Sequence, residues 1–355
     1  MTPPVPTEEL TPVLQKRVAR LNRLNEGEEN GTPLAETVRA GLTHLWETGG
    51  RLGSMASGLA PESIYVREPF ICDQVTKPAL GELVKSSGLQ LRLLLLLLFD
   101  AQCRHPMGEH VRNVRGVSRG RNDEYLAWRD LVLTDTHPTS GTGRSSGVLR
   151  ARQITEALVA LENKKLVTIP TTHGKRHYDR FQMLEETGSS GDAPAYTGPD
   201  SGVAIPRNFF TNLWVFALTD TEIAAYLALL YMRKAHLGYH EQVGVFLTAE
   251  HREKYFGLTR TTWRSVDLLH RYRLIDRMPS TGRSFRSGKV GQFPERWANR
   301  EVLPVRHKIV DKALDRLAIP AIRQVLTAPT DLDKQRLEIG QAAIDANQNL
   351  ELPTL

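Results

Sequence analysis

Cysteine is scarce in this chain of 355 residues, which contains only Cys72 and Cys103. The two lie in different segments and form neither a CxxC pair nor a zinc-site spacing, so we expect two reduced thiols. The first ten residues, MTPPVPTEEL, lack the basic and apolar regions of a secretory signal. These absences predict a cytoplasmic protein without a disulfide scaffold.

Long apolar runs are also missing. The run most like a membrane segment, residues 93–99, has seven residues and is bounded by Arg92 and Asp100. A membrane-spanning helix needs about 20 apolar residues. We therefore expect a buried core helix over 89–103 and no membrane partner.

Motifs of catalysis and metal binding are missing as well. The glycine-containing segments 141–147 and 282–289 do not have the GxxxxGK[ST] spacing of a phosphate-binding loop. His236 and His240 stand four residues apart, but without the glutamate of an HExxH zinc motif. We therefore expect a protein that is not an enzyme and that has no metal and no cofactor.

Positive charge, by contrast, is concentrated in one stretch. The chain has a net charge of +6, and residues 250–300 hold twelve Lys and Arg against five Asp and Glu, a surplus of seven. This stretch alone accounts for the net charge of the whole chain. A local excess of this kind is typical of a surface that contacts nucleic-acid phosphates.

The basic stretch also predicts two helices joined by a tight turn. One helix is expected over 249–256, a turn at Gly257, and a second helix over 259–273, with Thr259 as its N-cap. Residues three or four apart share a helix face, so this second helix has an apolar face and a polar stripe. The apolar face comprises Trp263, Val266 and Leu269, and the polar stripe comprises Arg260, Arg264, Asp267 and Arg271.

A β-hairpin is expected after the second helix. An apolar strand over 274–278 precedes a loop rich in glycine and arginine, and 290–293 is the expected return strand. An earlier segment has the same order, with helices over 89–103, 123–133 and 148–164 and then a hairpin over 166–184 with Lys175 and Arg176 at its tip. The order therefore predicts two units of the same architecture.

We accordingly expect a mainly α protein with small β-hairpins, an α+β fold class with two winged-helix-like domains plus N- and C-terminal helices. A second strong helix is expected over 219–236, and a further one over 305–317. The segment rich in Gly, Ser, Pro and Asp predicts an interdomain linker. The expected parts are an N-terminal arm and helix (1–63), domain 1 (64–184), the linker (185–204), domain 2 (205–303) and a C-terminal helical extension (304–355).

The segments 219–236, FLTAEHREKYFGLTRTTWRSVDLLHRYRLID and MPSTGRSFRSGKV together resemble a winged helix-turn-helix DNA-binding domain. As a tandem of two such units, the chain is similar to transcriptional regulators and to plasmid replication initiators. The resemblance implies a recognition helix over 259–273 and a wing over 283–289. In domain 1, Glu156 and Glu162 accompany Arg150 and Arg152, so that unit is expected to read bases poorly and to grip phosphates or mediate dimerisation instead. The DNA-binding residues expected are Thr259, Arg260, Thr261, Thr262, Arg264, Arg271, Arg283, Arg286, Lys289, Lys175 and Arg176.

The expected function is sequence-specific binding of double-stranded DNA, in the role of a transcriptional regulator. The alternatives are a plasmid or phage replication initiator that binds origin repeats, and a non-catalytic protein-interaction or RNA-binding module. A regulator is expected to bind a short palindrome as a homodimer, whereas an initiator is expected to bind direct repeats beside an AT-rich segment. Composition does not separate these roles.

Overall fold

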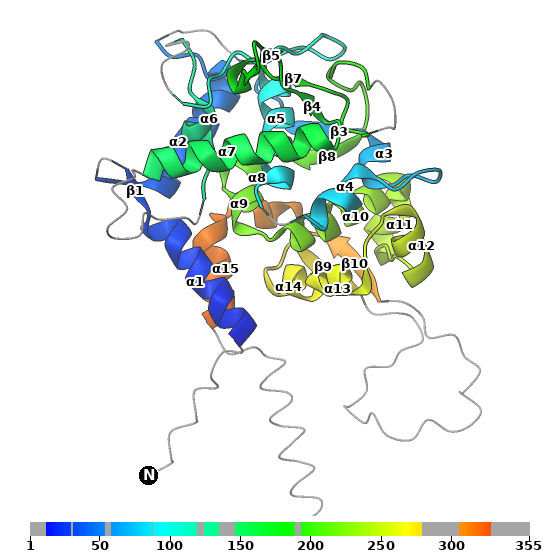
Figure 1. Cartoon of the computed structure of the whole chain (residues 1–355). Helices are drawn as coiled ribbons and strands as arrows, with labels where there is room; N and C mark the ends of the chain where they lie inside the picture. Colours follow the sequence, from blue (N-terminus) through cyan, green and yellow to red (C-terminus); the bar gives the residue numbers. More distant parts are fainter. Residues whose placement is uncertain are drawn as a thin grey trace, which may run out of the picture.

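Helices dominate the computed structural model, and the strands pair in small antiparallel sheets of two (Figure 1). The predicted fold class, mainly α with small β-hairpins, is confirmed. The structure describes residues 12–29, 31–53, 58–86, 88–118, 124–134, 146–188, 193–278 and 305–327.

The first half of the chain is built around α5 (Gln90–Arg104), in which all residues from Leu93 to Ala101 are buried. This confirms the expected core helix. The predicted helix over 123–133 is much shorter, because Tyr125 forms a β-bridge with Arg51 and Ala127 is extended. The elements that follow α5 are α6 (Trp128–Leu131), α7 (Ser146–Asn163), β4 (Val167–Thr168), β5 (Thr171–Thr172), β6 (Lys175–Arg176), η1 (Tyr178–Arg180) and β7 (Gln182–Met183).

The second half is built around α10 (Asp220–Ala235), which confirms the helix predicted over 219–236. Thr219 and Glu222 form a capping box at its start, in which each side chain accepts from the other's backbone N–H. The neighbouring elements are β8 (Val203–Pro206), α8 (Asn208–Thr211), α9 (Trp214–Ala217), α11 (Leu237–Val243), α12 (Ala249–Tyr255), α13 (Arg260–Trp263), α14 (Ser265–Arg271), β9 (Ile275–Met278) and β10 (Arg306–Ile309).

A small sheet completes this second half. β10 pairs antiparallel with β9, and on its other side His307 forms a bridge with Val245 through two backbone hydrogen bonds of 2.7 and 2.8 Å. β10 therefore lies between β9 and the bridge residue Val245. In chain order the second half has α10, α11, the bridge residue Val245, α12, α13–α14, β9 and β10.

The two halves repeat a detail at the end of the helix before the hairpin. Lys165 follows α7 with φ 58°, and Arg273 follows α14 with φ 61°. The next residue then donates its N–H back to the helix, Leu166 to Leu161 at 3.0 Å and Leu274 to Leu269 at 3.0 Å. This is the Schellman ending, here with a cation at the position usually held by glycine.

The C-terminal segment differs from the prediction. The helix expected over 305–317 is wrong, because Arg306–Ile309 is β10 and Asp311–Asp315 is the 3-10 helix η3. Along β10 half-buried and buried residues alternate, which is a strand period. The strand expected over 290–293 lies outside the described residues, as do residues 331–347, but the strand that returns to β9 is β10, within the segment assigned to the C-terminal extension.

The segment predicted as an interdomain linker is packed where the structure describes it. Glu186 and Tyr196 are fully buried. Arg67 donates to Glu186 from its backbone N–H at 2.9 Å and from its guanidinium at 2.7 Å. β8, which begins at Val203, pairs antiparallel with β3 (Ser63–Val66), and the buried apolar residues of both halves form one cluster. The two halves therefore share one hydrophobic core, instead of being connected only by a flexible linker.

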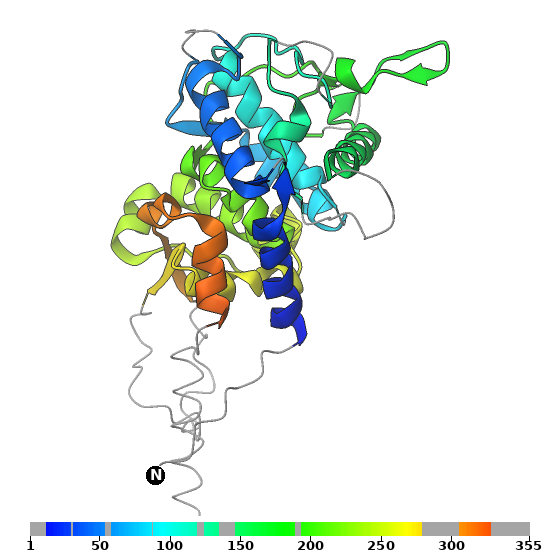
Figure 2. The same cartoon turned by 90° about the vertical axis from the view of Figure 1, so that its left-hand side faces the viewer.

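The N-terminal helix is part of this body as well. α1 (Pro12–Glu26) lies alongside α15 (Ala318–Thr327), as both views show (Figure 1, Figure 2). Arg17 is 8% exposed and donates to the Glu222 carboxylate at 2.6 Å. The expected N-terminal arm is thus docked through its arginines. α1 leads through β1 (Glu28–Glu29) and β2 (Thr32–Pro33) to α2 (Leu34–Thr48).

Candidate nucleic-acid interface

The predicted helix-turn-helix is formed by α12, a turn and α13–α14. Gly257 turns the chain with φ 64°, a conformation that favours glycine. The Thr259 hydroxyl accepts from the Thr262 N–H at 3.2 Å, which confirms it as the N-cap of α13. The second helix is interrupted only at Arg264, which keeps right-handed helical φ and ψ.

This second helix is fixed to α10. Val266 is 3% exposed and Leu269 is fully buried, so the predicted apolar face does lie on the core. The Ser265 hydroxyl donates to the Thr221 hydroxyl at 2.9 Å, and Tyr272 donates to the Glu222 carboxylate at 3.1 Å. The side chains on the opposite face are therefore carried by a rigid support.

Three of the predicted DNA-binding residues form an exposed group at the start of this helix. Arg260, Thr261 and Arg264 are exposed. Within the part of the chain that the structure describes, neither guanidinium has a hydrogen-bond or ion-pair partner. Two unpaired cations beside a hydroxyl are suited to acceptors on an incoming ligand.

Two other predicted residues of the same helix point elsewhere. Thr262 is 7% exposed, and its hydroxyl lies 3.1 Å from the Thr259 hydroxyl, so little of its side chain is accessible for the predicted phosphate contact. Arg271 is half-buried and donates to the Val325 carbonyl in α15 at 3.4 Å, which keeps it on the core side. Asp267, also on the polar stripe, forms an ion pair with Arg277 of β9.

The three predicted wing residues, Arg283, Arg286 and Lys289, lie outside the described residues. The hairpin of the first half, β5–β6, lies within the described residues and projects from the rest of the molecule (Figure 2). Its Lys175 and Arg176 are exposed, and Arg176 forms an ion pair of 3.3 Å with Glu162 of α7.

The first-half hairpin and α7 enclose a groove of about 690 Å³. We call it the α7 groove. Besides the two predicted cations, its basic lining residues are Arg152, His177 and Arg180. Arg180 was not among the DNA-binding residues expected from the sequence, although it follows Arg176 by four residues. The groove concentrates positive charge in a concave surface, where electrostatic attraction of an anion is strongest.

The acidic residues of α7 have separate roles. Glu156 pairs with Arg152 at 2.7 Å, and both side chains are more than half exposed. Arg150 is fully buried, so it is not part of the surface. The expectation that this helix is less suited than α13–α14 to contact bases is consistent with the exposed Glu156 on it.

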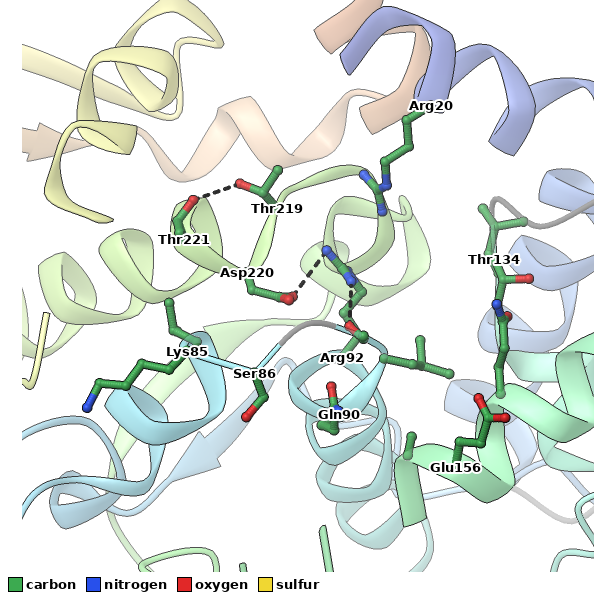
Figure 3. A pocket seen from close by; sticks show the side chains of 16 residues that line it. Arg20, Lys85, Ser86, Gln90, Arg92, Thr134, Glu156, Thr219, Asp220 and Thr221 are labelled. Carbon is green, nitrogen blue, oxygen red and sulfur yellow. Dashed lines mark hydrogen bonds and ion pairs between the residues drawn. The ribbon is translucent and has the colours of Figure 1, made fainter. Parts of the chain in front are cut away.

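A hollow of about 710 Å³ lies between α7 of the first half and the start of α10 of the second half (Figure 3). Glu156 of α7 lies on one side, and Thr221, which is bonded to Ser265 of α14, lies on the other. Arg92 at the start of α5 pairs with Asp220 of α10 at 3.1 Å on the floor. Burial raises the pKa of Asp220, although Arg92 opposes this effect. α7 and the start of α10 therefore border one concavity, and α14 is bonded to α10 at its edge through Ser265 and Thr221.

Contacts between the halves hold these helices in a fixed relation. α3 (Glu68–Ile71) and α4 (Ala79–Val84) pack on α10. A Cβ on Gly81 of α4 would lie 3.0 Å from the Phe256 carbonyl oxygen. The Asp73 N–H donates to the Tyr255 carbonyl at 3.0 Å, also at the end of α12. The end of α12 in the second half thus packs directly against α4 and Asp73 of the first half.

No group of three or more His, Cys, Asp or Glu side chains suited to a metal ion occurs among the described residues. In the same residues, no helix has the length and apolar character needed to cross a membrane. No protein-family model, curated protein or solved structure that was compared with the chain matches it. The site is therefore interpreted from its own geometry.

Proposed function

We propose that this protein binds double-stranded DNA in a sequence-specific manner, in the cytoplasm and without catalysis, metal or cofactor. The observation that carries the proposal is the exposed group of Arg260, Thr261 and Arg264, whose two guanidinium groups have no partner among the described residues, at the start of a helix that packs on the core by its opposite face. The first turns of the second helix of a helix-turn-helix are the part that reaches base edges in a major groove.

The residues have different roles in this proposal. Arg260 and Arg264 donate to base edges, preferably the O6 and N7 acceptors of guanine, and Thr261 contacts a base or an adjacent phosphate. The cations of the α7 groove neutralise phosphates and give affinity without sequence information. Arg283, Arg286 and Lys289, in the wing expected over 283–289, remain proposed phosphate contacts.

The fixed tandem of two unlike units bears on the biological role. A single chain in which the unlike helices α13–α14 and α7 are held by one core is suited to an asymmetric DNA site, and repeated copies of such a site are direct repeats. This observation favours the role of a replication initiator that binds origin repeats. The transcriptional regulator remains the competing role, and it requires a homodimer on a palindrome.

Selection of bound fragments from random double-stranded DNA tests both levels of the proposal. We expect one asymmetric motif, and Arg264→Ala is expected to weaken binding to it by about 1–3 kcal/mol and to relax the preference at one base pair. The control Lys312→Ala removes an exposed cation of η3, distant from the helix in sequence, and is expected to leave the motif unchanged. A palindromic motif would favour the regulator, and absence of any enriched motif would refute sequence-specific binding.

A further inference from the structure

An aromatic-lined pocket lies next to the helix-turn-helix but outside the proposed DNA-binding group. It has a volume of about 450 Å³, within the range of small-molecule sites. α10, α11 and α12, which are labelled in Figure 1, all contribute residues to it. Its lining residues are Met232, His236, Tyr239, Val245, Phe246, Thr248 and His251.

Arg306 lies beside the pocket and is not one of its lining residues, but its guanidinium lies over the rings of two residues that are. The Arg306 guanidinium carbon lies 5.0 Å from the centre of the Tyr239 ring and 5.9 Å from that of Phe246. Among the described residues this guanidinium has no carboxylate or carbonyl partner. Tyr239 is 47% exposed, an unusual exposure for so large a ring. The arrangement places a cation beside the aromatic rings that line the pocket.

We propose that this pocket binds a planar aromatic molecule that carries an anionic group. An aromatic plane packs against Tyr239 and Phe246, which offer apolar area and offset stacking. The anionic group accepts from Arg306, whose planar donors suit a carboxylate or a phosphate in a bidentate geometry. The exposed imidazoles of His236 and His251 supply further polar contacts at the rim.

The pocket is connected to the helix-turn-helix through two of its walls. Thr248 is the N-cap of α12, where its hydroxyl accepts from the His251 N–H at 3.2 Å. Val245 is bridged to His307 of β10, in the sheet of the hairpin. A ligand in contact with both residues biases the position of α12 and of the sheet relative to α10. On the premise of the proposed function, occupancy of the pocket changes the affinity for DNA.

Calorimetric titration of the full chain without DNA tests the binding step. The probes are indole-3-carboxylate and adenosine monophosphate, which share an aromatic plane and an anion. Indole lacks the anion, and cyclohexanecarboxylate lacks the aromatic plane. We expect at least one of the first two probes to bind at least tenfold more tightly than both of the others, and the tighter one identifies a carboxylate or a nucleotide ligand. If neither binds below millimolar concentration, the proposal is refuted.

Two variants assign the binding to this pocket. Arg306→Met removes the charge and keeps an apolar side chain, and Tyr239→Leu removes the ring face. Each is expected to weaken the better probe at least tenfold, as expected for loss of a charge-assisted hydrogen bond or of an aromatic contact. The control Lys312→Met makes the same charge change on η3 and is expected to leave binding unchanged. Unchanged binding in both pocket variants would refute the assignment.

The regulatory step has a separate measurement. A saturating concentration of the better probe is expected to change the affinity for the selected DNA at least fivefold, in either direction. An unchanged affinity would refute the coupling. Failure of the proposed DNA function is visible without any probe, so it is distinguishable from failure of the pocket.

Discussion

A Cβ on Gly81 would lie 3.1 Å from the Cα of Gly257, so α4 rests directly on the turn of the helix-turn-helix. Gly257 itself needs a left-handed backbone to make that turn, and Gly81 needs the absence of a side chain to approach it. Two glycines that are far apart in the sequence thus set how closely the two halves pack.

Gly81→Ala tests this contact. The added methyl group meets backbone atoms on the opposite side, which have little freedom to move away, so we expect a loss of about 1–3 kcal/mol in the free energy of unfolding. Gly238→Ala is a matched control, because a Cβ there meets nothing within 4 Å and the residue lies in helix α11. That control is expected to raise stability by about 0.5–1 kcal/mol. Urea denaturation measures both, and equal effects would contradict the contact.

Glu222 is expected to be a key residue of the second half. Its carboxylate accepts from Arg17, from the Thr219 N–H and from Tyr272, and it is 1% exposed. Glu222→Ala leaves the buried Arg17 without its counter-charge, so we expect a loss of about 3–5 kcal/mol. A double-mutant cycle with Arg17→Met is expected to show a coupling of at least about 1 kcal/mol, measured by urea denaturation. Additive effects would show that α1 is not held by this ion pair.

Glu156 is expected to oppose DNA binding. It faces the hollow and pairs with Arg152 of the α7 groove. Glu156→Gln frees the Arg152 guanidinium and removes a negative charge. We expect a roughly two- to fivefold gain in DNA affinity, because an exposed ion pair contributes little free energy. Fluorescence anisotropy at two salt concentrations measures the gain, which should shrink as salt rises. Glu36→Gln, an exposed acid on α2, is the control for net charge, and an equal gain there would remove the role of the groove.

His307 predicts a pH dependence of stability. Burial, together with the nearby charges of Arg277 and His270, lowers its pKa from 6.5 to about 4. The Trp263 ring, whose centre is 6.5 Å from that of His307, covers it on another side. Between pH 6.5 and 4 the unfolded chain binds the proton and the folded chain does not, so stability is complete above pH 6.5 and falls as the pH is lowered.

The size of this effect follows from the shift. We expect His307 to contribute a loss of about 3 kcal/mol in the free energy of unfolding between pH 6.5 and pH 4. His307→Leu is expected to flatten that part of the curve, measured by urea denaturation at stepped pH. His110→Leu, at an exposed position, serves as the control. An identical slope in His307→Leu and in the parent protein would contradict the assignment.

The sequence predicted the parts of the fold that local patterns determine. The capping residues Thr219 and Thr259 and the periodic burial of Val266 and Leu269 are visible in the sequence, and the structure has the corresponding helices. β10 was assigned to a helix, because Ile309, Val310 and Ala313 stand at helical spacing while the partner that makes a strand, β9, is distant along the chain.

The candidate site was predictable to a similar extent. Arg260 and Arg264 are exposed as expected, because burying a charged side chain costs free energy unless a partner compensates it. Arg271 belongs to the same polar stripe, but it is half-buried and bonded to α15. The spacing of residues within the stripe does not predict contact with a helix that begins more than 40 residues later. The α7 groove and the aromatic pocket likewise arise from residues that only the tertiary fold brings together.

The antiparallel pairing of β3 with β8 has a practical consequence for work on fragments. Each of these strands is the sole sheet partner of the other among the described strands, since Ser63–Val66 pairs only with Val203–Pro206. A fragment that ends before β8 therefore presents unpaired backbone donors and acceptors, which attract other chains and promote aggregation. Either half produced alone is expected to be recovered as insoluble material, while co-expression of both halves restores a soluble complex by strand complementation.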